Sequence, residues 1–388
     1  MTMKCHAYDI TFAYGAAMID LALALGCALF STHVLSLALA WRKCCRRSRL
    51  SGPQPKVSLV RPVCGLDFDV EATLASSFAQ NYPDYEVLFC APRADDPVVA
   101  LVRRLMDEHP GVSARLLIGE TQLSKNPKLN NMAKGWSQAT GELVVFADSN
   151  LLLPSDYCAK IAAAFAQGEA VVVSAPPVGD KAESMFGEVE CAMLNTHAAR
   201  WQFAASELGL DFAQGKTLAF RRSAFGAELM SELGTEPAED AAATKIVRAK
   251  GASLHVLAPA FVHPVGPRTA GSFWSRHVRW ARLRRVTFPF IFAFEAACGV
   301  FPALLALSLS PSIPGHQLPL WLLACIGAWY GAEYALARSL GWRTNAWFVP
   351  ACLIRDAMLP AFYVAAWMSA RFQWRGHAMD GAVRRPEK

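Results

Sequence analysis

Uncharged, apolar residues are concentrated towards the two ends of the chain, and a region of ordinary globular composition lies between them. Residues 21–41 carry no charged side chain, and with the apolar residues before Asp20 they exceed the roughly 20 residues that span a bilayer. A basic cluster follows this run, and no small-residue cleavage site stands out. We therefore predict a transmembrane anchor over residues 10–41, with an outside N-terminus, rather than a cleaved signal peptide.

The second apolar region covers residues 286–370. Its uncharged stretch, residues 296–332, is interrupted by Gly315 and three prolines, which predicts two spans. A third apolar segment, near residues 347–370, contains Arg355, Asp356 and two prolines. Because a charge inside a membrane is expensive and normally faces protein or water, this segment is predicted to be re-entrant or interfacial. The basic tail, residues 371–388, then stays on the inside, as the positive-inside tendency favours.

The middle region, residues 50–285, alternates between two patterns. Short apolar runs with β-branched residues predict strands at Val57–Val60, Tyr85–Cys90, Arg115–Ile118, Leu143–Ala147 and Ala170–Ser174. Helical patterns between them cover Ala72–Ala79, Pro97–Glu108, Leu129–Gln138 and Asp156–Phe165. Strands that alternate with helices predict an α/β fold with a mostly parallel sheet. Ligands of such sheets bind at the carboxyl ends of the strands, so chemistry is expected in the residues just beyond them.

Composition and charge agree with a membrane-anchored protein. Of the 388 residues, 53% are hydrophobic and 18% are charged, against about 25% charged residues in soluble domains. The net charge of +6 is too small to indicate nucleic-acid binding, so no nucleic-acid partner is expected. Basic clusters at residues 42–49 and 276–285 flank the apolar regions and predict a cytosolic middle domain in a multi-pass protein. The eleven scattered cysteines form no CxxC pair, which favours a reduced, cytosol-facing chain without structural zinc.

Two phosphate-binding motifs are excluded. Gly215-Lys216-Thr217 resembles the end of a P-loop, but position 210, where the motif needs its first glycine, is Leu210. No GxGxxG sequence follows a predicted strand, so a dinucleotide site of the Rossmann type is not expected.

Three acidic sites follow predicted strands or open a predicted helix. They are Asp95-Asp96-Pro97, Asp148-Ser149-Asn150 and Glu239-Asp240. Each alone is explained by helix capping, for which Asp is favoured. Together they indicate a metal–nucleotide site, in which Asp148 and Asn150 would supply oxygen ligands for Mg²⁺ or Mn²⁺.

A basic segment precedes the second apolar region. Arg276 and Arg279, three residues apart, share one face of a helix, so both guanidinium groups can reach one diphosphate. Trp280 could stack on a ligand or anchor at the interface. The alternative interpretation is a basic amphipathic helix on the membrane surface.

This combination resembles the D, D, D, (Q/R)xxRW signature of membrane glycosyltransferases and, more narrowly, glycosyltransferase family 21, the ceramide glucosyltransferases. The resembling segments are Tyr82 to Val87, Asp95-Asp96-Pro97, Asn126-Pro127-Lys128-Leu129-Asn130-Asn131, Ala147-Asp148-Ser149, Thr196-His197, Ala238-Glu239-Asp240 and Arg276 to Trp280. The Asn-Pro-Lys-x-Asn-Asn block is the part that points to ceramide enzymes. Asp148-Ser149-Asn150 differs from the full Asp-x-Asp motif.

The resemblance implies a GT-A (Rossmann-like) catalytic domain at residues 50–285 that ends in an interfacial helix. It implies that Asp240 is the general base and that Asp148 binds the metal. The other implied donor and acceptor contacts are Asp95 or Asp96 on uridine, His197 near the donor or acceptor, Lys128 on the donor, and Arg276, Arg279 and Trp280 on the diphosphate. Two of these residues have simpler explanations, because His197 could be a structural histidine and Lys128 a helix-start residue.

The implied reaction is an inverting, metal-dependent transfer of a hexose from a UDP-sugar to the primary hydroxyl of ceramide, with glucose as the family expectation. A hopanoid or other lipid glycosyltransferase is the nearest alternative. A non-catalytic membrane binding protein on a degenerate GT-A scaffold is the alternative from another class. The composition, rich in Ala and Arg, suggests a bacterial source, for which the membrane would be the inner one.

Overall fold

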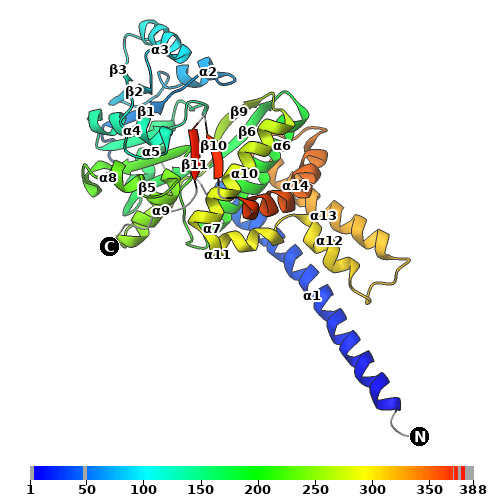
Figure 1. Ribbon diagram of the computed structural model, residues 1–388. Helices are drawn as coiled ribbons and strands as arrows, with labels where there is room; N and C mark the ends of the chain where they lie inside the picture. The colour runs from blue at the N-terminus through cyan, green and yellow to red at the C-terminus, as the bar shows by residue number, and fades with distance from the viewer. Residues whose placement is uncertain (1–3, 47–49, 370, 375–376, 381–388) are drawn as a thin grey trace.

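The computed structural model describes residues 4–46, 50–369, 371–374 and 377–380. Arg47 and Arg49 of the first basic cluster, and most of the basic tail at 371–388, lie outside these residues. Figure 1 shows a sheet-containing part at one end of the molecule and a long helix, α1 (Lys4–Cys45), that reaches away from it.

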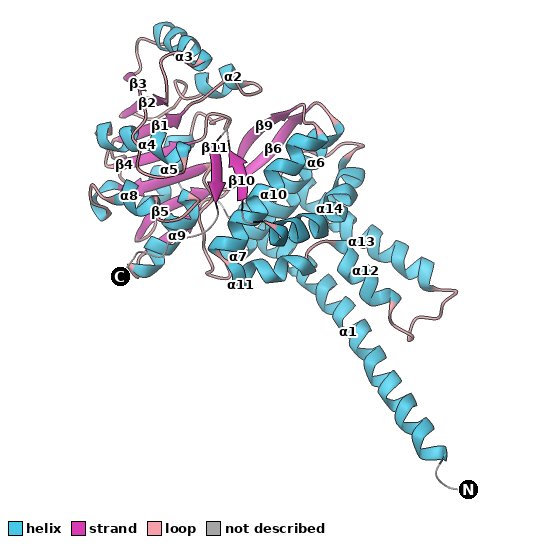
Figure 2. Ribbon diagram, in the orientation of Figure 1, coloured by secondary structure: helices cyan, strands magenta, loops and turns pink. Residues whose placement is uncertain are grey.

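A seven-stranded sheet forms the centre of the sheet-containing part (Figure 2), in the order β3-β2-β1-β4-β7-β5-β8. The strands are β1 (Val57–Pro62), β2 (Tyr85–Ala91), β3 (Ala114–Ile118), β4 (Leu143–Ala147), β5 (Ala170–Ala175), β7 (Thr217–Arg221) and β8 (Ser253–Val256). β7 is antiparallel to its neighbours β4 and β5, and the other pairings are parallel. The predicted mostly parallel sheet is therefore present.

Helices cover both faces of this sheet, as a parallel sheet requires. One face packs against α2 (Val70–Ala75), α3 (Pro97–Glu108) and α5 (Tyr157–Ala166), and the other against α4 (Pro127–Gln138), α8 (Leu229–Leu233) and α9 (Glu239–Ala249). Successive residues of β4 point to alternate faces, so Val145 joins one core and Val144 and Phe146 join the other.

A second, two-stranded parallel sheet lies beside the first. It pairs β6 (Pro177–Ala182) with β9 (Phe261–Gly266). The helices next to it are α6 (Met185–Ala192), the π-helix η1 (Met193–Ala199), α7 (Arg200–Glu207) and α10 (Ala270–Thr287), and a short 3-10 turn, η2 (Arg222–Ala224), follows β7. The five predicted strands are present, but the sequence patterns did not predict β6, β7, β8 or β9.

The two apolar regions form helices that lie on the side of α10 away from the seven-stranded sheet. They are the end of α1, then α11 (Pro289–Ala293), η3 (Phe294–Ala297), α12 (Val300–Ser308), α13 (Leu318–Ser339) and α14 (Phe348–Met368), before the hairpin β10 (Arg371–Trp374) and β11 (His377–Asp380). Among the described residues, Leu21–Cys45, α13 and α14 are long and apolar enough to cross a membrane. Residues 289–308 form two helical pieces bent by 55°, which together could count as a fourth crossing. These candidate spans fit a membrane protein.

The charged pair in α14 is satisfied inside the protein. Arg355 forms two contacts of 3.0 Å with Glu333 of α13 and one of 2.8 Å with the neighbouring Asp356. Asp356 also accepts hydrogen bonds from the backbone of Val300 and the hydroxyl of Tyr330. α14 is one continuous helix from Phe348 to Met368, rather than a re-entrant segment. It packs along α6 and α10 of the sheet-containing part and also against α13.

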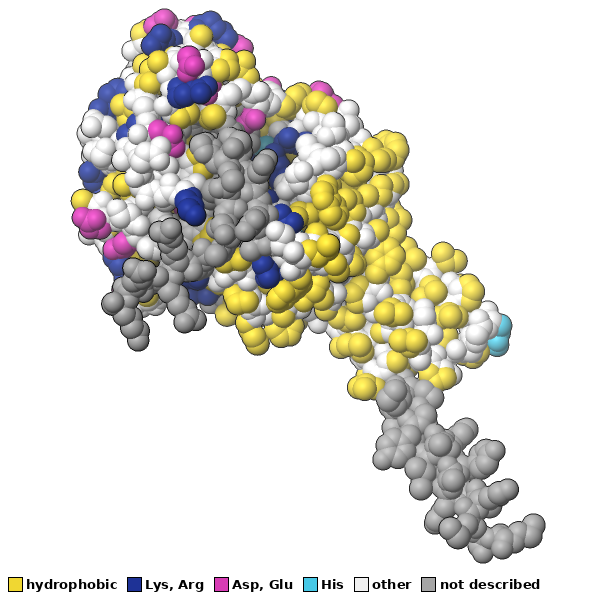
Figure 3. Space-filling model, in the orientation of Figure 1, with side chains coloured by type: hydrophobic (Ala, Val, Ile, Leu, Met, Phe, Trp, Pro, Cys, Tyr) yellow, Lys and Arg dark blue, Asp and Glu magenta, His cyan; other side chains and the backbone are white. Residues whose placement is uncertain are grey.

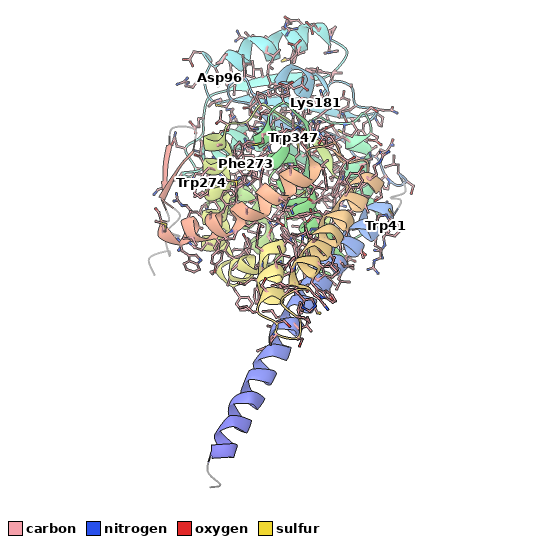
Figure 4. All side chains as sticks on the ribbon, turned by 90° about the vertical axis from the view of Figure 1, so that its right-hand side faces the viewer. Trp41, Asp96, Lys181, Phe273, Trp274 and Trp347 are labelled. Atoms are coloured by element: carbon pink, nitrogen blue, oxygen red, sulfur yellow. The ribbon has the colours of Figure 1, made fainter. Side chains whose placement is uncertain are left out.

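The outer surface of these helices is apolar. Figure 3 shows a continuous hydrophobic face over this end of the molecule, and exposed side chains on it include Phe290, Leu305, Leu309, Leu320 and Leu323. Exposed apolar patches of this size mark interaction or membrane surfaces. Three tryptophans are exposed where the apolar helices meet the sheet-containing part (Figure 4), namely Trp41, Trp274 and Trp347. Membrane proteins carry belts of such aromatic side chains at the membrane surface.

We expect Arg355→Met to destabilise the protein by about 3–5 kcal/mol, because it leaves two buried carboxylates without their cation. The melting temperature in detergent measures this, and Arg338→Met, on an exposed residue at the end of α13, is the matched control. Adding Glu333→Gln to Arg355→Met should restore part of the loss. Equal melting temperatures for Arg355→Met and Arg338→Met would contradict this role.

Candidate active site

The carboxyl end of β4 carries the residue around which the site is arranged. Asp148 follows the last residue of β4, where ligands of parallel sheets bind. Because β7 is antiparallel to β4, its first residue, Thr217, pairs with Ala147. Lys216 therefore lies opposite Asp148, whose backbone N–H donates to the carbonyl of Lys216 at 3.1 Å.

The start of α4 places the side chain of Lys128 beside Asp148. Asn126 caps this helix by accepting from the backbone N–H groups of Lys128 and Leu129, and Pro127 occupies the first turn. The Lys128 ammonium lies 2.7 Å from Asp148 Oδ1 and 2.7 Å from Glu239 Oε1. It also donates to the carbonyl oxygen of Gly215 at 2.7 Å. The Asn-Pro-Lys block thus forms a helix start whose lysine points into the site.

The start of α9 supplies two adjacent carboxylates. Glu239 accepts from the Asn126 amide at 2.9 Å in addition to its contact with Lys128. Asp240 accepts from the backbone N–H of Gly215 at 2.9 Å and from that of Ala241 at 2.8 Å. The positive end of the helix dipole favours carboxylates at this position. The structure therefore brings Asp148, Lys128 and Asp240 together, with Glu239 and Gly215 between them.

The surroundings of this cluster shift the pKa values of Asp148 and Asp240 in opposite directions. Burial alone would raise the pKa of Asp148, but the ammonium groups of Lys128 and Lys216 hold it well below its usual range. Burial and the adjacent charge of Glu239 raise the pKa of Asp240 to about 6, against the opposing effect of Lys128. Asp148 is therefore ionised at neutral pH, whereas Asp240 can gain or lose a proton near neutrality.

A second lysine binds the other oxygens of the Asp148 loop. The Lys216 ammonium lies 3.2 Å from Asp148 Oδ2 and donates to Asn150 Oδ1. Burial and the charges of Arg276 and Lys128 lower the pKa of Lys216 to about 8, against the attraction of Asp148. His263 of β9 holds the loop through a 2.7 Å contact between Nδ1 and the Asn150 carbonyl.

The basic helix α10 reaches the same region. Glu190, buried in α6, contacts His277 at 2.8 Å and lies 3.6 Å from Arg276. Burial alone would raise the pKa of Glu190, but His277 and Arg276 lower it to about 2. The Arg276 guanidinium lies over the ring of Trp280, 5.7 Å from its centroid. Arg279, one helical turn on and partly exposed, shares this part of the helix.

Three predicted site residues lie elsewhere. Asp95 is exposed and pairs with Arg93. Asp96 caps α3 by accepting from Val98, and it also accepts from the backbone of Gly65. His197 lies in the π-helix η1, where burial and the charges of Arg355, Arg200 and Arg284 lower its pKa well below the ordinary value. His197 is thus kept neutral among arginines on the side of the apolar helices.

The oxygens of Asp148 and Asn150 fit a divalent cation. Among the described residues, no three His, Cys, Asp or Glu side chains are placed to hold a metal by themselves. Mg²⁺ in nucleotide sites commonly uses one or two protein oxygens and completes its shell with phosphates and water. Here the Lys216 ammonium lies against both oxygens, so a positive charge already occupies the position between them.

Sequence patterns missed three members of the site. Gly215 and Lys216 resemble a P-loop in sequence, but they precede an antiparallel strand that no alternating pattern predicted. Glu239 was recognised only as the neighbour of Asp240. The signal that could have found them is the Gly-Lys pair in front of the apolar run Thr217–Phe220, which suits a strand pairing with β4.

Known proteins similar to this chain define its class. A model of glycosyl transferase family 21 matches residues 22–384. Ceramide glucosyltransferase 3 of Caenorhabditis elegans is 25% identical over 358 residues, which is 90% of this chain and 78% of that protein. Ceramide glucosyltransferase of Komagataella phaffii is 35% identical over 99 residues, 24% of this chain and 19% of that protein.

A solved structure resembles the fold. The mannosyltransferase PcManGT from Pyrobaculum calidifontis, solved in complex with GDP-Man and Mn²⁺, matches with a TM-score of 0.53 and 19% sequence identity, covering 89% of this chain and 98% of that chain. The sheet, the helices on its two faces and this neighbour show a GT-A-like α/β fold. The chain belongs to glycosyl transferase family 21. The resemblance stated from the sequence motifs is confirmed.

We expect Gly215→Ala to reduce transfer at least about tenfold with little change in melting temperature. An added Cβ would lie 2.8 Å from Glu239 Oε1, 3.2 Å from Lys128 Nζ and 3.4 Å from Asp240 Oδ2, so the cluster would have to move, and small displacements at a reacting centre cost about 10²-fold. Gly168→Ala is the control, because an added Cβ there meets nothing within 4 Å. Wild-type kcat/KM in Gly215→Ala would show that the close approach of Gly215 is not needed.

Proposed function

We propose that this protein transfers glucose from UDP-glucose to the primary hydroxyl of ceramide with inversion at the anomeric carbon. The observation that carries the proposal is the Asp240 carboxylate, held at the start of α9 beside the cationic cluster on Asp148. The lipid acceptor and the sugar are taken from the name of the Caenorhabditis elegans relative, which matches 90% of the chain.

Asp240 is proposed as the general base. Its Oδ2 accepts from Gly215 and its Oδ1 from Ala241, and these two contacts fix the carboxylate plane. As the acceptor oxygen attacks the anomeric carbon, the hydroxyl proton passes to Asp240 and the bond from the sugar to UDP breaks. A base in this position typically contributes about 10²–10⁴-fold to the rate.

The cations near Asp148 are proposed to receive the diphosphate. Lys216 and Arg276 lie close enough for the charge of Arg276 to act on Lys216, and Arg279 follows one turn along α10. Guanidinium groups bind diphosphates through paired hydrogen bonds. A divalent cation held by Asp148 and Asn150 would supply further positive charge to the leaving diphosphate. Stabilisation of the charge that develops on a leaving group usually contributes most to the rate of such reactions.

The acceptor is proposed to reach the site from the bilayer. Helix α10 carries Arg276 at its middle and is followed directly by the apolar helices α11 and α12. Residues 50–285 would then be a cytosolic catalytic domain between an anchor at 10–41 and membrane helices within 286–370. His197, neutral and partly exposed in η1, is proposed to line the acceptor path, and Asp95 or Asp96 the uridine end of the donor site.

The purified protein in lipid nanodiscs should convert ceramide and UDP-glucose to glucosylceramide, detected by lipid mass spectrometry. We expect Asp240→Asn to lose about 10²–10⁴-fold of this activity while UDP binding stays within about twofold, because the amide cannot accept the proton. Asp107→Asn, on an exposed position of α3, is the control. Product formation by Asp240→Asn at the wild-type rate would refute the assignment of the base, and UDP release only with a different lipid would refute the acceptor.

The rate should rise with pH through an apparent pKa near 6. A base works only when deprotonated, and the pKa of Asp240 is raised to about 6 by burial and by Glu239, so activity is lost as the pH falls below that value. Glu239→Gln removes one of the two raising effects and should move this limb of the kcat/KM profile to lower pH. An unchanged limb in Glu239→Gln would contradict the coupling.

A further inference from the structure

Lys216 occupies an unusual position for a lysine. Its ammonium lies between Asp148 Oδ2, at 3.2 Å, and Asn150 Oδ1, the two side-chain oxygens that suit a divalent cation. The side chain is largely buried, with 13% of its surface exposed. It comes from the residue just before β7, so the antiparallel pairing of β7 with β4 fixes its Cα opposite Asp148.

The two lysines on Asp148 are held to different degrees. Lys128 contacts two carboxylates, Asp148 and Glu239, and the carbonyl of Gly215, all at 2.7 Å. Lys216 contacts one carboxylate, at the longer distance of 3.2 Å, and one neutral amide. A competing cation would therefore displace Lys216 before Lys128, because Lys216 has the weaker charge-assisted partners.

If the proposed function holds, the displaced Lys216 ammonium can bind the diphosphate of the nucleotide. A divalent cation on Asp148 and Asn150 would carry the nucleotide diphosphate with it, and the Lys216 ammonium contacts these same two oxygens, so the diphosphate comes beside Lys216. A lysine side chain has a flexible four-carbon stem and binds phosphate as a point charge. Rotation of this stem exchanges one set of oxygens for another without moving β7.

We propose that Lys216 is a substitute cation of the donor site. Without nucleotide, its ammonium holds the oxygens of Asp148 and Asn150 and competes with the divalent cation for them. When the cation and the nucleotide diphosphate bind together, the cation takes these oxygens and the ammonium turns to the phosphates. Lys216 thereby favours the joint binding of metal and nucleotide over binding of the metal alone.

The test is a pair of binding measurements on the full chain in detergent. Mn²⁺ is titrated without nucleotide and followed by the electron paramagnetic resonance of the free ion, and UDP is then titrated at saturating Mn²⁺ by calorimetry. We expect Lys216→Met to bind Mn²⁺ alone at least about fivefold more tightly than the wild type, because the ammonium no longer competes for Asp148 and Asn150. We expect it to bind UDP at least about fivefold more weakly, because the contact of the ammonium with the phosphates is lost. Lys216→Arg keeps the charge and should bind Mn²⁺ with nearly wild-type affinity.

The control is Lys160→Met, which breaks a lysine–carboxylate pair with Asp156 on the helix after the same loop. Both of its affinities should match those of the wild type. Opposite changes in the two affinities are not produced by a general loosening of the site. Unchanged or weaker Mn²⁺ binding, or unchanged UDP binding, in a folded Lys216→Met would overturn the proposal. Neither titration uses ceramide or a sugar, so failure of the lipid transfer assay would count against the proposed function alone.

Discussion

The ammonium group of Lys128 holds the active site together. It joins the end of β4, the loop before β7 and the start of α9 through Asp148, Gly215 and Glu239. Two adjacent carboxylates in a largely buried position repel each other, and one of them stays ionised there only when a cation lies close by. Lys128 supplies that cation, and burial and the charge of Glu239 still raise the pKa of Asp240 to about 6. The same ammonium fixes the elements that carry the candidate site to one another.

Polar contacts continue from this cluster towards the apolar helices. Glu190 of α6 holds His277 and lies near Arg276 of α10, which joins the basic helix to α6. On the other side of η1, Arg355 of α14 donates to Thr196 while it is paired with Glu333. The π-helix that carries His197 is thus tied through Thr196 to the buried ion pairs of Arg355. Such helices are frequent at functional sites because their extra residue shifts the side chains that follow.

Sequence patterns predicted the parts of the fold that depend on local periodicity. The strand Leu143–Ala147 and the helix Pro97–Glu108 agree with the structure residue for residue, because a short apolar run with β-branched residues and a capped amphipathic pattern each specify one element. The role of Lys216 could not be predicted, since it depends on a tertiary pairing between β7 and β4. Arg355 similarly suggested a re-entrant or interfacial segment, because its partner Glu333 belongs to another helix and the sequence of α14 does not show this pairing.

The first helix is more than a tether. Arg200 of α7 contacts His33 and Ser36 inside α1 at 3.1 and 2.6 Å, and Glu207 binds Arg42 and Arg46 at its end. These contacts are spread over more than three turns, from His33 to Arg46, so they fix the position of α1 relative to the sheet-containing part. For an enzyme that takes its acceptor from a bilayer, these contacts then set the height of the proposed base, the Asp240 carboxylate, above the lipid. Lipids would be sorted by how far their hydroxyl stands out of the headgroup layer before any pocket recognises their shape.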